Sequence, residues 1–431
     1  MNDPSKLTRR SLLARAGAAG AGAAALGGLA GCENTTTPVP AEGAVASGKG
    51  ILGDPTAGGP VDGSGIPLAR RDYPVVLPRI GKPVATGEPE RGGELQIYNY
   101  ADYLNPAVLK EFGKREGVSV RVTTFETLEE AFSKLSTGRL KFDVIFTTPD
   151  WLSRLVGRRL LQPLNYDLIP NLEKTVWPEA ANPFYDVGPR YTIPYVVYTT
   201  GIGWRNDIVD VDPQKLPTIW DALWDAKDHR GKVQLLNDPR EGIGAALMRQ
   251  RNVNLNTESP ADIDQAVADL KQLNRDVRVK VAINAYEALP TGRTVLGEVW
   301  SGDILNAIIS YLPENLGPEV ISYTYQREGG PVFNDCIGVA AAAEKPVMAH
   351  RFLDFLLNDD IALQNFTGYV GYQPPLNSLT PEKLVADGVV PAHLETALVS
   401  RETYSTGNAY LALTAQGSRL WDRGWQEFRA G

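Results

Sequence analysis

The strongest constraint on the fold is an alternation between apolar runs typical of strands and amphipathic runs typical of helices, which begins at Gly92. Residues 95–98 (Leu-Gln-Ile-Tyr) predict a buried strand. Asn105 followed by Pro106 predicts the start of a helix, because Asn is a favoured N-cap and Pro is favoured at the first helical position. Gly117 predicts the end of that helix.

The same alternation continues over the next residues. Valines at positions 118, 120 and 122 predict a second strand, an apolar face over residues 128–135 predicts a helix, and residues 143–146 predict a third strand. This strand–helix–strand–helix–strand order favours a parallel sheet covered by helices, with ligand sites at the carboxyl ends of the strands.

A second α/β stretch begins near Arg205. Ser259-Pro260 predicts a helix start, and a strand that ends at Val299-Trp300 is followed by predicted helices over residues 303–312 and 346–357. The chain has 431 residues, of which 43% are hydrophobic, so it is long and apolar enough for a body of two lobes.

The N-terminal residues predict export. Thr8 to Leu13 (Thr-Arg-Arg-Ser-Leu-Leu) fits the twin-arginine pattern, and an Ala/Gly-rich run ends in Leu29-Ala30-Gly31-Cys32, which resembles the lipobox of exported bacterial lipoproteins. The run is too short and too rich in glycine for a membrane-spanning helix. We therefore expect residues 1–31 to be a cleaved signal and Cys32 to carry lipid.

Residues 32–91 are rich in Gly, Pro, Ala and Thr and predict a tether between the lipid and the body. Gly48 to Gly53 matches the G-x-G-x-x-G dinucleotide pattern, but no strand precedes it and no helical pattern follows, so that interpretation fails. The more apolar stretch from Ile66 to Val84 is expected to pack on the body.

Composition excludes several classes of partner. The net charge is −8, and removing residues 1–31, which carry +3, leaves −11; this disfavours nucleic acid and is compatible with cationic ligands. With Cys32 assigned to lipid, Cys336 has no partner for an internal disulfide. The three histidines lie far apart in sequence, so we expect no histidine-rich metal site and no cofactor.

A series of short motifs then occurs in a fixed order along the body. The motifs are Tyr98–Tyr103, Tyr191–Tyr195, Trp220–Trp224, Leu236–Glu241, Gly297–Gly302, Glu328–Asp335 and Gly371–Pro374. In this order and spacing the chain, over about residues 94–378, resembles the spermidine/putrescine-binding proteins of ATP-driven (ABC) uptake systems.

The resemblance implies an α/β fold of the periplasmic-binding-protein type, with two lobes, hinge strands and a ligand cleft between the lobes. The implied lobes are residues 92–204 plus 334–378 and residues 205–333 plus 379–431. Crossovers are expected near Gly203–Arg205, near Phe333–Asp335 and after Gln373-Pro374.

A polyamine is a flexible alkyl chain with ammonium groups at intervals. Carboxylates best replace the water around each ammonium, and aromatic faces cover the methylenes while attracting the charges. Carrying the family's ligand positions across implies that Asp238, Glu241 and Asp335 hold ammonium groups. The aromatic rings of the implied site are Tyr100, Tyr103, Trp300, Phe333 and Tyr372. Thr148 falls at a position where the family has a small hydroxyl.

Each of these residues also has a simpler interpretation. Asp238 could cap a helix, with Glu241 three residues on as in a capping box, and Arg240 could pair with either acid. Asp335 could be a hydrogen-bond acceptor in the hinge, and Trp300 and Phe333 could belong to the core.

Two departures from the family pattern stand out. Asp150 occupies a position where the family usually has Tyr; we expect it to cap a helix that starts at Trp151, although it could instead add a fourth acid to the cleft. A polar Gln that is often found late in the family has no clear counterpart here.

The sequence therefore predicts a monomeric, lipid-anchored extracytoplasmic receptor, in the periplasm or on the outer face of the cell membrane. The receptor would deliver a polyamine to an ABC permease and would not be an enzyme. Alternatives are a receptor of the same fold for an amino acid, a sugar or a metal complex, or an exported hydrolase. G-x-S-x-G and H-E-x-x-H motifs do not occur, which disfavours the hydrolase.

Overall fold

A computed structural model describes residues 75–80, 85–188, 191–250, 254–327 and 329–431. The twin-arginine motif, Cys32 and the Gly48–Gly53 motif lie outside the described residues. Within the described part, no helix combines the length and the apolar character needed to cross a bilayer.

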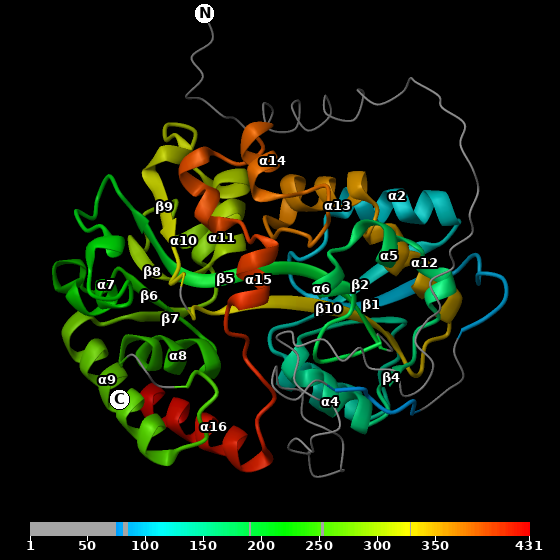
Figure 1. Cartoon of the computed structure of the whole chain (residues 1–431), viewed down its shortest axis with the longest axis horizontal. Coiled ribbons are helices and arrows are strands. Elements are labelled where there is room, and N and C mark those ends of the chain that lie inside the picture. Colours follow the sequence, from blue (N-terminus) through cyan, green and yellow to red (C-terminus); the bar gives the residue numbers. More distant parts are fainter. Residues whose placement is uncertain (1–74, 81–84, 189–190, 251–253, 328) are drawn as a thin grey trace, which may run out of the picture.

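A mixed sheet runs across the whole body and joins its two halves (Figure 1). The described strands are β1 (Glu94–Tyr100), β2 (Ser119–Phe125), β3 (Val144–Thr147), β4 (Leu161–Gln162), β5 (Thr192–Arg205), β6 (Val233–Leu236), β7 (Lys280–Ala282), β8 (Leu296–Trp300), β9 (Ile321–Thr324) and β10 (Val332–Ala340). Their order is β2-β1-β3-β10-β5-β8-β6-β7, with β4 beside β10 and β9 beside β5. The predicted β1, β2 and β3 form as parallel neighbours.

The long strand β5 connects the two halves of the sheet. Residues 192–199 pair with β10, whereas residues 200–205 pair with β8 and β9. The change of partners lies between Thr199 and Thr200, a little before the expected crossover near Gly203–Arg205. Strands β5 and β10 therefore lie side by side at the boundary between the halves, where hinge strands are expected.

The first half is a sheet covered on both faces. One hydrophobic core contains residues of α2 (Pro106–Glu116), α12 (Pro346–Leu356) and α13 (Asp359–Asn365). A second core contains residues of α3 (Leu128–Ser136) and α4 (Pro149–Gly157). Helix α2 confirms its predicted ends, since Asn105 Oδ1 accepts the N–H of Ala107 and Gly117 adopts the left-handed conformation with φ 70°.

The second half has its own core, built around α7 (Asp221–Asp225), α8 (Pro239–Gln250), α9 (Pro260–Val277) and α16 (Ala415–Arg429). Ser259 caps α9 as predicted. Helices α10 (Ala285–Ala288) and α11 (Ser301–Asn306) cover the other face (Figure 1). The helix expected over residues 303–312 is α11 followed by a π-helical turn over residues 307–311.

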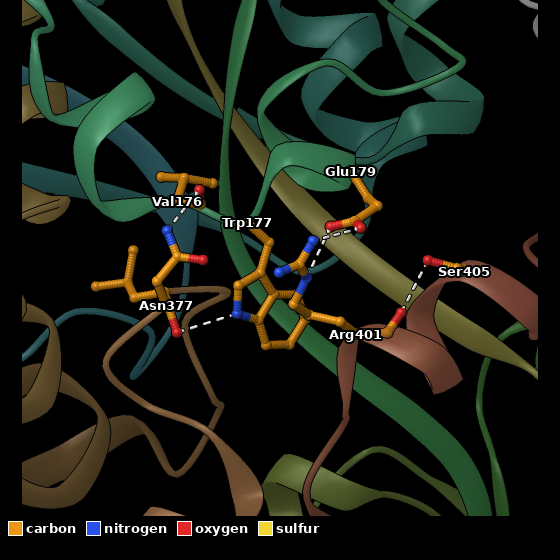
Figure 2. A network of polar contacts seen from close by, with 7 residues as sticks. Val176, Trp177, Glu179, Asn377, Arg401 and Ser405 are labelled. Atoms are coloured by element: carbon orange, nitrogen blue, oxygen red, sulfur yellow. Dashed lines mark hydrogen bonds and ion pairs between the residues drawn. The ribbon is translucent and has the colours of Figure 1, made fainter. Parts of the chain in front are cut away.

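The C-terminal part of the chain is tied back to the first half by polar contacts (Figure 2). The segments involved are α5 (Asn171–Thr175), α6 (Pro178–Ala181), residues 376–377 and α15 (Arg401–Thr406), and α14 (Pro381–Ala386) lies between the last two in the chain. The guanidinium of Arg401 donates to both carboxylate oxygens of Glu179, at 2.6 and 3.0 Å, and Trp177 Nε1 donates to the carbonyl of Leu376 at 3.0 Å. The contact between Arg401 and Glu179 holds the start of α15 beside α6 of the first half.

The end of the predicted tether packs on the body, as expected for part of the Ile66–Val84 stretch. Val75 and Leu77 are buried in the core that contains α3 and α4, and the hydroxyl of Tyr191 donates to the carbonyl of Pro78 at 2.6 Å. Further on, the carboxylate of Glu90 accepts the first free N–H groups of α12.

Asp143 provides a test of this architecture. Its buried carboxylate accepts the N–H of Gln96 from β1 and the N–H groups of Glu344 and Lys345 before α12, each at 2.8 Å. Asp143→Ala should lower the free energy of unfolding by about 3 kcal/mol, because it leaves three backbone donors without an acceptor. Urea unfolding measures this loss, with exposed Asp228→Ala as control. A loss below about 1 kcal/mol would contradict the assigned contacts.

Candidate functional site between the lobes

A cavity of about 600 Å³ lies between the two halves and receives side chains from both. All nine residues named from the sequence line it. They are Tyr100, Tyr103, Thr148, Asp238, Glu241, Trp300, Phe333, Asp335 and Tyr372. The structure therefore brings the whole predicted set together, while the part each residue plays in binding stays a prediction.

Asp335 enters the cavity from the hinge strand β10. The pairing register of β10 with β5 shifts between Asp335 and Cys336, and bulges of this kind re-aim side chains beside functional sites. One carboxylate oxygen accepts the hydroxyl of Tyr103 at 2.8 Å and the other accepts that of Tyr198 at 3.1 Å. Asp335 is thus a hydrogen-bond acceptor in the hinge and also part of the cavity wall.

Glu241 enters from the first turn of α8. Trp300 Nε1 and Thr200 Oγ1 donate to one of its oxygens, at 2.7 and 3.1 Å, and the hydroxyl of Tyr410 donates to the other at 3.1 Å. Because Trp300 is only partly buried and its N–H is directed at this carboxylate, Trp300 forms part of the cavity wall and is not simply a core residue.

Asp238 confirms its capping interpretation and also lines the cavity. Its Oδ1 accepts the N–H groups of Arg240 and Glu241, at 2.7 and 3.2 Å, at the start of α8. The reciprocal half of a capping box does not form, because the carboxylate of Glu241 turns to Trp300, Thr200 and Tyr410 instead.

Arg240 is turned away from the neighbouring acids. Its guanidinium donates to the carbonyl of Leu411 at 3.1 Å and to Asn256 Oδ1 at 2.5 Å. It also lies over the rings of Tyr410 and Trp421, at 4.7 and 4.6 Å from their centroids. Among the ion pairs of the described residues, none joins Arg240 to Asp238 or Glu241, so the pairing considered from the sequence is not formed.

Aromatic rings form the rest of the wall. Tyr103 lies edge-on to Tyr100 at 5.7 Å and to Tyr372 at 5.3 Å, so these rings support one another. Phe333 stacks on Tyr410 with centroids 4.5 Å apart. Phe333 and Asp335 are two residues apart on β10, and both line the cavity.

Sequence reasoning missed further residues of this wall, and three of them contact predicted site residues. Tyr198 lies on β5 just after the recognised Tyr191–Tyr195 motif, and Tyr410 lies on the segment between α15 and α16. Asp303 follows Trp300 by one helical turn; it is 4% exposed, and its Oδ1 accepts the hydroxyl of Tyr372 at 2.7 Å. The three-residue spacing from Trp300 could have identified Asp303, whereas Tyr410 depends on a distant contact that carries no local signal.

The expected capping role of Asp150 is wrong. Helix α4 begins at Pro149, because proline is well suited to the first helical position, and Thr148 is its N-cap residue. Asp150 lies inside the first turn, lines the cavity and accepts the hydroxyl of Thr148 at 2.5 Å.

Burial makes several of these carboxyl groups unusually basic. It raises the pKa of Asp335 and of Asp303 to about 7 each, and that of Glu241 to about 8. Burial also raises the pKa of Asp238, although the two backbone N–H donors oppose the shift. Behind Glu241, the fully buried Glu298 has a strongly raised pKa for the same reason. In the described part of the chain, no group of three or more His, Cys, Asp or Glu side chains is arranged to hold a metal ion.

Comparison with known proteins identifies the family. The family model described as "Bacterial extracellular solute-binding protein" matches residues 107–392, which is more than half of the chain. The chain belongs to this family. Members of the family are solute-binding receptors, in agreement with the two-lobed fold and the cavity between the lobes.

Three similar proteins illustrate the relationship. The spermidine/putrescine-binding periplasmic protein of Escherichia coli K12 is 28% identical over 338 residues, covering 78% of this chain and 92% of that protein. The putrescine/agmatine-binding protein of Pseudomonas aeruginosa is 26% identical and covers 83% of this chain and 97% of that protein. The solved structure titled putative spermidine/putrescine ABC transporter, from Listeria monocytogenes, has a TM-score of 0.67 at 23% identity and covers 78% of this chain and 98% of that chain. The structural likeness confirms the predicted fold class.

The raised pKa values of Asp335 and Glu241 predict how stability depends on pH. A carboxyl group whose pKa is raised by folding favours the folded state at low pH, and this advantage is lost as pH rises through the folded-state pKa. The ligand-free protein should therefore lose stability between about pH 5 and pH 8. Urea unfolding at several pH values measures the slope.

Asp335→Asn removes one titrating group and should flatten that slope, while exposed Asp228→Asn should leave it unchanged. An identical slope in wild type and Asp335→Asn would show that Asp335 is ionised in the ligand-free protein, contrary to the assignment.

Proposed function

We propose that this chain is an extracytoplasmic receptor that binds a polyamine of the spermidine or putrescine kind and delivers it to an ABC permease. The observation that carries the proposal is the composition of the cavity wall. Carboxylates and aromatic rings from both lobes line it together, and the guanidinium of Arg240, which also borders the cavity, is held by Leu411 and Asn256.

This wall matches the chemistry of a polyamine. Each ammonium group needs acceptors to replace its water, and hydrogen bonds to charged groups contribute about 1.5–3 kcal/mol each. The alkyl segments need apolar cover, which Tyr103, Trp300 and Tyr372 supply. Ring faces attract the cations as well, by about 0.5–2 kcal/mol per contact. The relatives named for spermidine, putrescine and agmatine support this ligand class.

Two lobes give the receptor its mechanism. Asp335 lies on the hinge, Tyr103 belongs to the first half and Asp238 and Trp300 to the second, so only the closed form presents all of them to one ligand. A ligand that contacts both halves shifts the equilibrium toward closure. In the structure Arg154 of α4 donates to Ser418 of α16 at 2.5 Å; both residues line the cavity, so this hydrogen bond joins the two halves there.

We further propose that the protein leaves the cytoplasm by the twin-arginine route and is anchored through lipid on Cys32, in the periplasm or on the outer face of the cell membrane. The anchor keeps a monomeric receptor near its permease and so raises the effective concentration. The receptor releases its solute unchanged and performs no catalysis.

Other solutes and a hydrolase fit the cavity less well. An amino acid requires a cation directed at its carboxylate, but the guanidinium of Arg240 is occupied by Leu411, Asn256 and two rings. A glycosidase requires acids on both sides of the scissile bond. Asp238 and Glu241 lie within one turn of α8, so they do not flank a substrate in this way.

A thermal-shift screen of the purified full-length chain tests the ligand class. Putrescine, spermidine and spermine should raise the unfolding temperature, because they bind only the folded state. Arginine, lysine and glucose should leave it unchanged. Stabilisation by sugars or amino acids without stabilisation by amines would overturn the proposal.

Asp335→Asn tests the site itself. The substitution keeps the shape of the side chain but removes the negative charge on the hinge, so spermidine affinity should fall by about tenfold or more. Calorimetric titration gives the affinity, and a retained circular-dichroism spectrum shows that the fold is intact. Unchanged affinity would exclude Asp335 from the site.

A further inference from the structure

Asp150 is an acid of the cavity wall that is not among the nine residues assigned to ligand binding. It lies in the first turn of α4, which leads from the carboxyl end of β3 into the cavity wall. Asp150 is partly buried, and Thr148 donates its hydroxyl to one carboxylate oxygen.

Two arginines line the same cavity as Asp150, and both are engaged by other groups. The charge of Asp150 also attracts Arg240, since it opposes the lowering of the Arg240 pKa by burial. Arg154, one helical turn further along α4, lies over the ring of Trp151 at 4.6 Å and donates to Ser418. Across the cavity Arg240 is held by its own partners. Among the ion pairs of the described ranges, none includes Asp150.

The charge of Asp150 reaches Asp238 in the second half and Asp335 on the hinge. Burial is the largest cause of the raised pKa of Asp238 and of Asp335, and the negative charge of Asp150 raises both further. The first lobe, the hinge and the second lobe therefore each contribute a carboxyl group to one cavity, through Asp150, Asp335 and Asp238, beside Glu241 and Asp303. A ligand with more positive charges relieves their mutual repulsion more completely.

We propose that Asp150 is a specificity-determining residue that makes the cavity prefer amines with three or more ammonium groups to diamines. The inference rests on the proposed function, since it assigns the length and charge of the ligand within the polyamine class. The acids of the hinge and the second lobe, Asp335, Asp238 and Glu241, hold the two ends of a diamine. Asp150 adds an acceptor on the first lobe, which only a triamine or tetra-amine can use while its other ammonium groups occupy the hinge and the second lobe.

The experiment is calorimetric titration of putrescine, spermidine and spermine into full-length wild type and Asp150→Asn. The wild type should bind spermidine and spermine more tightly than putrescine. Asp150→Asn should lose about tenfold in affinity for spermidine and spermine and less than about threefold for putrescine.

Two further variants control the interpretation. Asp150→Glu keeps the charge and should keep the preference for the longer amines. Asp228→Asn removes an equal charge from the exposed surface of the second half and should change no affinity. The unfolding temperature of Asp150→Asn shows whether this variant still folds. If it does not fold, Asp150→Ser replaces it in the titrations.

The outcomes separate this inference from the proposed function. Equal losses for all three amines, no loss at all, or a wild type that prefers putrescine would overturn the role of Asp150 while amine binding itself stands. A wild type that binds none of the amines would overturn both.

Discussion

Carboxyl groups that are enclosed in one cavity and form no ion pair within the described residues are the constraint on which the rest of this structure depends. Asp238, Glu241 and Asp335 lie in one cavity, each satisfied only by neutral donors such as tyrosine hydroxyls, an indole N–H and backbone N–H groups. Neutral donors lower the cost of burying these carboxyl groups, but the pKa values of Glu241 and Asp335 stay raised. A cationic ligand provides the positive charges that pair with these carboxylates. Ligand binding is therefore coupled to the ionisation of the site and to the closure of the lobes.

The fold positions these acids by simple local means. Asp150 and Asp238 lie at the starts of α4 and α8, where each helix begins after a strand of a different half. Asp335 lies on β10 where its pairing with β5 shifts, at the boundary between the halves. Because one acid belongs to each moving part and one to the hinge, any change in the angle between the halves changes the spacing of the charges.

Much of this could be predicted from the sequence, for identifiable reasons. The ends of α2 and α9 follow from local capping residues, and the strands of the first half follow from apolar periodicity. The nine site residues came from the ligand positions of the family that the chain resembles. Tyr410 and Tyr198 were missed because they join the cavity wall through contacts with Glu241 and Asp335, which lie far from them in the sequence. The capping role expected of Asp150 was wrong because Pro149 begins the helix before it.

A crystal structure of the protein grown with spermidine tests the central claim most directly. The account predicts ammonium nitrogens within about 3 Å of the carboxylates of Asp335 and Asp238, with the alkyl chain beside Trp300. Spermidine bound only on the outer surface, or a cavity in which these carboxylates face no ammonium group, would contradict it.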